Sequence, residues 1–117
     1  MNTDIGNYIV KGNQKQWSPL VENGIHYEGV WIKSLLYDHE KERSTTILLK
    51  FEPGASYPYH NHPAGEEIYV LSGEAIIENA ALTEGDYLYT PPGFKHSVKS
   101  ETGCILFFVV PEAVELL

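Results

Sequence analysis

The stretch GASYPYHNHPAGEEIYVLSG, residues 54–73, decides both the expected fold and the expected site of this chain. His60 and His62 stand two residues apart in it, and alternate side chains of an extended strand lie on one face of a sheet. Both imidazoles are therefore expected to point the same way. Glu66 follows after a short turn, so the stretch offers three ligands for one divalent metal ion. A fourth candidate ligand, His96, comes after a second stretch marked by Gly and Pro.

Short runs rich in β-branched and aromatic residues recur along the chain between turn signals, and no segment shows a helical period with caps. Two of these runs flank the charged loop 38–43 and predict a hairpin. Two others flank Ser72-Gly73, which predicts a second tight turn. This pattern indicates an antiparallel sandwich or barrel. The expected strands are residues 29–37, 44–51, 66–71, 74–78, 86–90, 96–99 and 104–110.

The length and composition predict a single globular domain. The chain has 117 residues, of which 43% are hydrophobic and 12% aromatic, enough for one core without staples. Residues 1–16 are polar and are expected to form an N-terminal arm, followed by the domain over residues 17–111. The tail 112–117 is expected to hold a short helical turn or an interface segment over residues 113–117.

The charge and hydropathy of the chain argue against several classes of partner. The formal net charge is −8 and no Lys/Arg cluster stands out, so the surface should repel nucleic-acid phosphates. The longest apolar run, residues 104–110, is far shorter than the roughly 20 residues that a membrane helix needs. The first residues do not resemble a secretory signal, and the lone Cys104 can form no intrachain disulfide. We expect a cytoplasmic protein that binds neither nucleic acid nor membrane.

Two stretches of the chain carry nine residues at fixed spacings: Gly54, His60, His62, Glu66 and Gly73 in the first, and Gly85, Pro91, Gly93 and His96 in the second. These positions match the two sequence motifs of the cupin family. Gly and Pro each make up only about 5–7% of residues in proteins, and a chance match at nine positions is negligible. The chain therefore resembles the cupins. From Trp17 to Cys104 it is also similar, more loosely, to a smaller branch that resembles the C-terminal domain of the ChrR anti-sigma factor.

The resemblance implies an all-β fold, the antiparallel double-stranded β-helix or jelly-roll barrel, with one divalent metal ion inside it. The ion could be Fe, Mn, Ni, Cu or Zn. Counting back seven residues from Gly73 selects Glu66 rather than Glu67 as the carboxylate ligand, and strand alternation then turns Glu67 outward. The ligands that carry over from the family are His60, His62, Glu66 and His96.

Two features depart from the usual family pattern. The second motif usually ends in Asn, where this chain has Ser100; that position is not a ligand, so the change affects a supporting hydrogen bond. The motifs are separated by only 11 residues, 74–84, which predicts a tight hairpin.

Strand parity assigns expected positions to the neighbours of the ligands. Ile68 and Val70 share the parity of Glu66 and should line an apolar cavity suited to a small, partly apolar ligand. Tyr57 and Tyr59 have the opposite parity to His60 and should face away from the metal. Other expectations are Tyr69 facing outward, a cavity rim drawn from Tyr87, Tyr89, Phe94 and Phe108, a surface position for His39, and Cys104 in the core or, alternatively, lining the cavity. His26, like His39, belongs to no ligand pattern.

The donor set leaves the role of the metal open. In a six-coordinate geometry four protein ligands leave two open positions for chemistry, whereas in a tetrahedron they leave none. Our first hypothesis is a metal-dependent oxidoreductase, dioxygenase-like, acting on a small organic molecule such as a diketone or phenol, with Glu66 leaving the ion to act as a catalytic base. The alternatives are a non-catalytic metal- or ligand-sensing module of ChrR-like type and a sugar isomerase or epimerase. Exposed sheet edges and many tyrosines also predict a homodimer.

Overall fold

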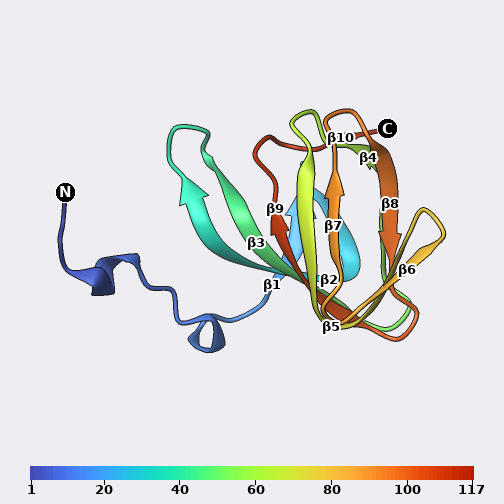
Figure 1. Ribbon diagram of the computed structural model, residues 1–117, viewed down its shortest axis with the longest axis horizontal. Helices are drawn as coiled ribbons and strands as arrows, with labels where there is room; N and C mark the ends of the chain where they lie inside the picture. The colour runs from blue at the N-terminus through green and yellow to red at the C-terminus, as the bar shows by residue number, and fades with distance from the viewer.

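The computed structural model describes residues 1–117 and confirms the predicted antiparallel all-β fold (Figure 1). Two short 3₁₀ turns, η1 (Ile5–Tyr8) and η2 (Gly12–Gln14), precede the strands. The strands are β1 (Ser18–Glu22), β2 (Ile25–Asp38), β3 (Arg43–Phe51), β4 (Ser56–Asn61), β5 (Glu66–Ile77), β6 (Ala80–Thr83), β7 (Tyr87–Thr90), β8 (Lys95–Lys99), β9 (Cys104–Val109) and β10 (Glu115–Leu116).

One continuous ladder of strands curls on itself to form the barrel. Its order is β1-β2-β3-β9-β5-β8-β4-β10, and β6 and β7 also pair with β5. The first half of β5 pairs with β7 and β9, and its second half pairs with β6 and, at Ile76, with β8. The long strand β5 therefore belongs to both walls, and the barrel encloses the space between them.

The tight turn predicted at Ser72-Gly73 is wrong, because β5 runs through it without reversing. A register shift between Val70 and Ser72 marks a β-bulge that bends the strand instead. Gly73 has φ +78°, and a Cβ added there would lie 2.2 Å from the carbonyl oxygen of Gly103. The glycine is required by this close backbone approach between β5 and the start of β9, and not by a hairpin.

The other two predicted hairpins are present. β2 and β3 pair from Val30↔Phe51 to Asp38↔Arg43 around the charged loop. The short segment between the two motifs forms the tight β5–β6 hairpin, whose turn residues Glu78 and Asn79 both have positive φ, 49° and 67°. Two consecutive residues with positive φ are typical of the two-residue turns whose twist matches that of the flanking strands.

The core occupies the space between the walls and is built from alternate residues of each strand. Ile68 and Val70 of β5 are fully buried, as parity predicted, and their register partners on β9, Phe108 and Leu106, lie beside them on the same inner face. On β3, Leu49 and Phe51 complete the same inner face. The barrel interior is therefore apolar on the β3, β5 and β9 side.

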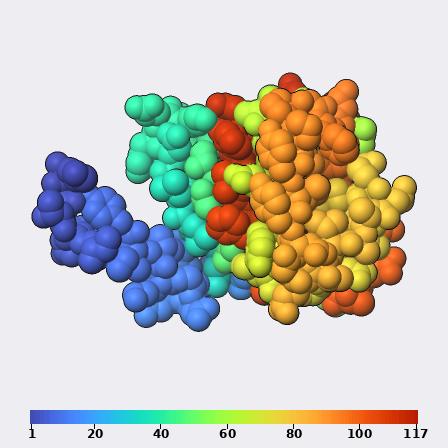
Figure 2. All heavy atoms as spheres, viewed as in Figure 1, coloured from blue at the N-terminus to red at the C-terminus, as the bar shows by residue number.

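Both ends of the chain lie outside this core. The first residues project away from the barrel as an arm (Figure 2), held at its base by hydrogen bonds from Lys15 Nζ to Ser34 O and from Lys33 Nζ to Gly12 O. The C-terminal segment is not a helical turn: β10 pairs with β4, at Glu115↔Asn61 and Leu116↔His60. No helix in the structure is long and apolar enough to cross a membrane.

Candidate metal centre

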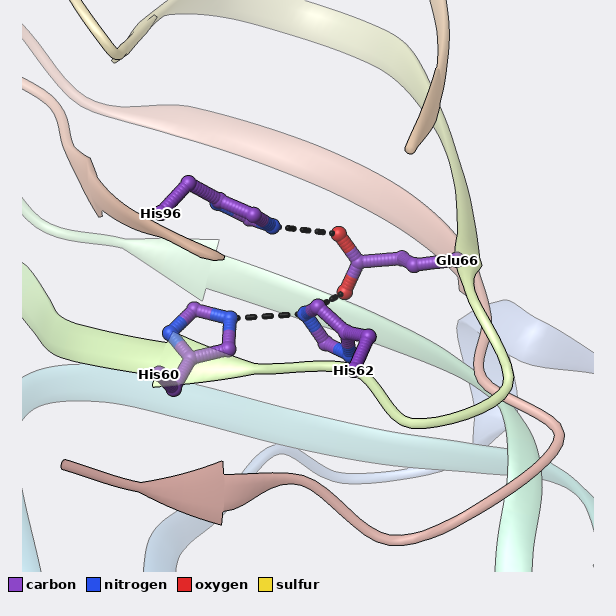
Figure 3. Close-up of side chains that lie close together, drawn as sticks. All are labelled: His60, His62, Glu66 and His96. Carbon is purple, nitrogen blue, oxygen red and sulfur yellow. Dashed lines mark hydrogen bonds and ion pairs between the residues drawn. The ribbon is translucent and has the colours of Figure 1, made fainter. Parts of the chain in front are cut away.

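Three strands and one loop bring the four predicted ligands together (Figure 3). His60 lies on β4, His62 directly follows that strand, and Glu66 is the first residue of β5. His96 lies on β8, where it is the register partner of His60. The two motifs, distant in sequence, thus supply neighbouring side chains because their strands pair.

Two hydrogen bonds to one carbonyl close the first loop and join it to the loop of the second motif. The carbonyl oxygen of His62 accepts from the backbone N–H of Gly65, at 3.0 Å, and from that of Gly93, at 3.1 Å. Gly65 has φ +80°, and a Cβ there would lie 2.9 Å from the carbonyl oxygen of Thr90. Only glycine fits this approach, so Gly65 lets the first loop close onto the second and fixes His62 beside Glu66.

The four side chains form one buried cluster. His60, His62, Glu66 and His96 are each at most 3% exposed. His62 Nε2 lies 2.7 Å from His60 Nε2 and 2.7 Å from Glu66 Oε2, and His96 Nε2 lies 3.1 Å from Glu66 Oε1. One ligand atom from each residue lies within 4.8 Å of all the others. The imidazoles and the carboxylate therefore converge on a common centre.

The hydrogen bonds around the cluster decide which imidazole nitrogens are free to bind an ion. His60 Nδ1 lies 2.7 Å from the carbonyl oxygen of Pro58, which can only accept, so this nitrogen carries the proton. His60 Nε2 is then left with its lone pair directed into the cluster. A backbone carbonyl on the outer nitrogen is also the usual arrangement for a metal-binding histidine. His96 Nδ1 lies 3.4 Å from the carbonyl oxygen of Ser97, on the outer side in the same way.

This donor set fits a divalent transition metal ion. Imidazole nitrogen and carboxylate oxygen are ligands that suit Zn, Fe, Mn, Ni and Cu, at about 2.0–2.2 Å from the ion. The 4.8 Å spread of the ligand atoms is close to the span across one such ion. The buried cluster can therefore hold one metal ion through His60, His62, Glu66 and His96.

Burial and mutual hydrogen bonding set the charge of the cluster. Burial lowers the pKa of His60 to about 4, assisted by the nearby His96 and His62, so its ring is neutral at pH 7. Burial alone would raise the pKa of Glu66, but hydrogen bonds from His62 and His96 outweigh it, and the net pKa is lowered. A neutral imidazole and an ionised carboxylate are the forms that bind metal.

Tyr57 was expected to face away from the cluster, and the structure shows that this prediction is wrong. The register along β4 and β8 shifts between Tyr57↔Val98 and His60↔His96, so three steps on β4 match two on β8. The bulge includes Pro58, which has no N–H to donate to a ladder. The bulge places Tyr57 on the same face of the sheet as His60, with ring centroids 4.8 Å apart, and leaves Tyr59 47% exposed.

Tyr57 also brings the carboxylate of Glu22 to the cluster, which no sequence pattern predicted. Its hydroxyl donates to Glu22 Oε1, on β1, which lies far from β4 in the strand order. The ring of Tyr27 packs against that of Tyr57, with centroids 4.9 Å apart. Burial, followed by the hydrogen bond to Glu22, raises the pKa of Tyr57 strongly, so the phenol stays protonated. Tyr57 and Glu22 form a proton-bearing pair beside His60.

A cavity of about 750 Å³ connects the cluster to solvent. His60, His62 and Glu66 lie on its wall, and so do Tyr57 and Glu22. Most of the remaining wall is apolar, contributed by side chains from β2, β3, β8 and β9. The lining residues at its rim are exposed and come from three segments, the β1–β2 turn, the β2–β3 loop and the C-terminal segment. They are Val21, Asn23, Glu42, Ala113 and Leu116.

The remaining predicted positions can be read directly from the structure. Glu67 points outward, as expected, and its Oε1 accepts a 2.7 Å hydrogen bond from the hydroxyl of Tyr87. Of the four aromatic residues expected at the rim, only Phe108 lines the cavity. The others are exposed elsewhere: Tyr87 and Tyr89 are register partners of the outward-facing Tyr69 and Glu67, and Phe94 lies in the loop before β8.

Cys104, His39 and Ser100 behave as the sequence indicated. Cys104 is buried in the core and does not line the cavity, and His26 and His39 are exposed. Ser100 keeps a supporting role in place of the usual Asn: its hydroxyl donates to the carbonyl oxygen of Glu74 at 2.6 Å and accepts from the N–H of Gly103 at 2.9 Å.

Two curated proteins match parts of the chain. DNA damage-repair/toleration protein DRT102 of Arabidopsis thaliana is 35% identical over 65 residues, covering 50% of this chain and 21% of that protein. Dimethylsulfoniopropionate lyase DddQ of Ruegeria pomeroyi is 36% identical over 52 residues, covering 40% of this chain and 26% of that protein. The matches thus span about a fifth to a quarter of the length of these relatives.

The fold resembles that of solved structures, and a family model covers nearly the whole chain. A candidate acetylacetone dioxygenase from Methylibium petroleiphilum superposes with a TM-score of 0.82, covering 100% of this chain and 85% of that one. Its sequence identity of 15% makes this a likeness of fold alone. The model of the ChrR cupin-like domain matches residues 6–113, nearly the whole chain. The chain therefore belongs to the ChrR cupin-like domain family of the cupins.

Proposed function

We propose that this protein is a metal-dependent enzyme that oxidises a small organic molecule with dioxygen. The observation that carries the proposal is the position of the His/Glu cluster on the wall of a 750 Å³ cavity that opens to solvent. An ion with a purely structural role needs no such access, since its ligands can close around it. A cavity of this size suits a small ligand.

The assignment of ligands follows from the cluster. His60, His62, Glu66 and His96 would hold the ion, with His60 Nε2 presented by the hydrogen bond of its other nitrogen to Pro58. A bound transition metal would supply Lewis acidity and, where it is redox-active, a route for electrons between substrate and dioxygen.

The residues of the chain contribute the rest. Apolar side chains along the cavity exclude water from the bound molecule and strengthen polar interactions inside it. Glu66 is our candidate for the general base, because it is the ionised carboxylate of the cluster and lies on the cavity wall. The hydroxyl of Tyr57, kept protonated beside Glu22, is placed to orient a ligand that lies against His60.

The named similarities support a small-molecule enzyme of this class. The fold likeness includes a candidate acetylacetone dioxygenase, a name that fits a diketone as the substrate to try first. A second reaction type, elimination by a lyase, is favoured by one specific observation: the Tyr57–Glu22 pair puts proton-transfer groups on the cavity wall. The partial match to DddQ points in the same direction.

The experiment that separates the two reactions is a substrate screen run with and without oxygen. The protein is loaded with Fe(II), Mn, Ni, Cu or Zn and given 2,4-pentanedione, other diketones and phenols while oxygen is recorded by electrode. The proposal predicts oxygen uptake that depends on metal and substrate, is lost in Glu66→Gln and persists in the surface control His39→Ala. Turnover that proceeds equally without oxygen would replace the oxygenase with the lyase. No turnover of any diketone or phenol under any metal loading would contradict the oxygenase proposal.

We also propose that two chains pair through the outer face of β5 and β7. Tyr69, Tyr87 and Tyr89 stand there between 42% and 57% exposed, next to Leu71, which is 42% exposed. Burying such a face is favourable and would remove an exposed strand edge. Light scattering on a size-exclusion column should give a molar mass twice that of the chain at micromolar concentration. The Tyr87→Glu variant should elute with the mass of a single chain. A monomeric wild-type protein would contradict this pairing.

A further inference from the structure

Arg43 is the one Lys or Arg side chain on the wall of the cavity that holds the candidate metal centre. It begins β3, directly after the charged β2–β3 loop. Leu49 and Phe51 of the same strand are buried and line the cavity. Arg43 is half-buried and lines the cavity next to Ser44, beyond the register shift between Ser44 and Thr46. Its position on the cavity wall, and not strand alternation, places it inside the barrel near the mouth.

The guanidinium has no acidic partner. The chain contains 16 acidic and 8 basic residues, yet no carboxylate lies within 4.0 Å of Arg43. The neighbouring Lys41, by contrast, pairs with Glu112 at 2.8 Å. A half-buried cation without a counter-charge gains more than an exposed one when an anion reaches it.

Most of the donors of Arg43 remain available. Its Nη1 donates to the carbonyl oxygen of Val110 at 2.6 Å, which fixes the plane of the group. A guanidinium has five N–H donors in a fork that matches a carboxylate. The three carboxylates that also line the cavity do not use them: Glu22 accepts from Tyr57, Glu66 contacts His62 and His96, and Glu42 makes no ion pair with Arg43.

The sheet register gives the separation between Arg43 and the cluster. Thr46 pairs with Val109, which pairs with Glu67, so Glu66 lies two strands away from Thr45 and about level with it. Arg43 lies two residues before Thr45, at the start of β3. With strands about 4.8 Å apart and about 3.3 Å per residue, the backbones of Arg43 and Glu66 lie roughly 12 Å apart. Both side chains point into the space between, which leaves room for a short ligand.

We propose that the cavity selects a small organic monocarboxylate, bound with its carboxylate on Arg43 and its apolar body directed toward the His/Glu cluster. Ile47, Leu49 and Phe108 form the apolar wall between the two ends. A monoanion is favoured over a phosphate because Glu22 and Glu42 also line the cavity and would repel a second negative charge. This inference rests on the proposed function, since it takes the reacting end of the molecule to lie at the metal centre.

The first test compares hexanoate with hexanamide, which differ in charge and little in shape. Binding is measured by ligand-detected NMR titration of the metal-free full chain. Charge-assisted hydrogen bonds predict that hexanoate binds about tenfold more tightly than hexanamide. Arg43→Gln should abolish the difference, and Arg43→Lys should keep part of it. Lys41→Gln, which removes a neighbouring positive charge outside the cavity, should leave it unchanged. Equal binding of the two probes to the wild-type protein, or binding of neither, would overturn the proposal.

The second test locates the two ends of the ligand. With Mn(II) loaded into the protein, the terminal methyl protons of hexanoate should broaden more than the methylene protons beside the carboxylate. The reverse order would place the carboxylate on the ion and overturn the proposal. If the protein binds no Mn(II) but keeps the Arg43-dependent preference in the first test, the selection of carboxylates stands and the metal-dependent function fails. If metal-dependent turnover is found without any Arg43-dependent preference, the proposed function stands and the selection of carboxylates by Arg43 fails.

Discussion

The phenol ring of Tyr57 stands edge-on against the imidazole of His60, with ring centroids 4.8 Å apart and the planes inclined by 84°. Residues three apart on an ideal strand would lie on opposite faces, and the bulge between them places both on the inner face. The consequence is that β4 supplies the cavity with a phenol as well as a candidate metal ligand, and that Glu22 becomes part of the same wall.

The Tyr57–Glu22 hydrogen bond should contribute to stability. Tyr57→Phe leaves the half-buried carboxylate of Glu22 without its donor, and a hydrogen bond to a charged group contributes about 1.5–3 kcal/mol. We expect a loss of that order in urea unfolding. The double-mutant cycle with Glu22→Gln should give a coupling energy above about 1 kcal/mol. Purely additive effects of the two substitutions would show that the pair does not interact in solution.

Gly73→Ala should severely destabilise the barrel. The added Cβ would lie 2.2 Å from the carbonyl oxygen of Gly103, so β5 and the start of β9 would have to separate. Gly24→Ala is the matched control, because Gly24 has the same φ of +78° with nothing within 4 Å. The left-handed conformation alone costs about 1–2 kcal/mol, and we expect Gly73→Ala to lose at least about 3 kcal/mol more through the clash. Similar unfolding midpoints for the two variants would contradict the close approach.

The metal-free protein should lose stability between pH 6.5 and 4. Burial lowers the pKa of His60 from 6.5 to about 4 in the folded state. The unfolded chain therefore takes up a proton first on acidification, which favours unfolding across that window and costs about 3 kcal/mol in total. Glu66 acts in the same direction at lower pH: its pKa is lowered from 4.5, so its stabilisation is present above that value and is lost as the pH falls through the folded pKa.

Urea unfolding of the metal-free protein at pH 7 and pH 5 measures this effect. About 2 kcal/mol of the His60 contribution should be lost by pH 5, and His60→Gln should flatten the dependence. His39→Gln, at an exposed position, should retain it. A wild-type protein equally stable at both pH values would show that His60 titrates normally.

The two adjacent glutamates should differ in their effect on metal binding. Glu66→Gln removes the only carboxylate of the cluster and should weaken metal affinity by at least about tenfold. Even the loss of a residue that only hydrogen-bonds to a metal ligand typically costs that much. Glu67→Gln should bind metal as the wild type does, because Glu67 points outward and contacts Tyr87. Isothermal titration of both variants with Zn or Mn decides between them, and a larger loss in Glu67→Gln would reverse the assignment.

The barrel and the convergence of its four polar side chains could be predicted because they depend on local signals. Alternation of side chains along a strand put Ile68 and Val70 inside and Glu67 outside, and fixed spacing paired the two motifs. These relationships are set by period and turn position, which a sequence displays directly.

What could not be predicted depends on irregularities and on tertiary contacts. A bulge changes the parity of every residue beyond it, so Tyr57 was placed on the wrong face. Gly73 looked like a turn residue, but the contact that requires it comes from Gly103, thirty residues further along the chain. Pro58 on β4 was the available signal for the bulge, since a proline within a strand often marks one. Nothing local indicated that Glu22 or Arg43 would reach the cavity.

The most direct test of the central claim is the metal content of purified protein, measured as atoms per chain by elemental mass spectrometry after loading and desalting. The account predicts about one transition metal ion per chain in the wild type and in His39→Ala, and a large loss in His60→Ala, whose Nε2 faces the centre of the cluster. Equal metal content in His60→Ala and His39→Ala, or no metal in the loaded wild type, would contradict it.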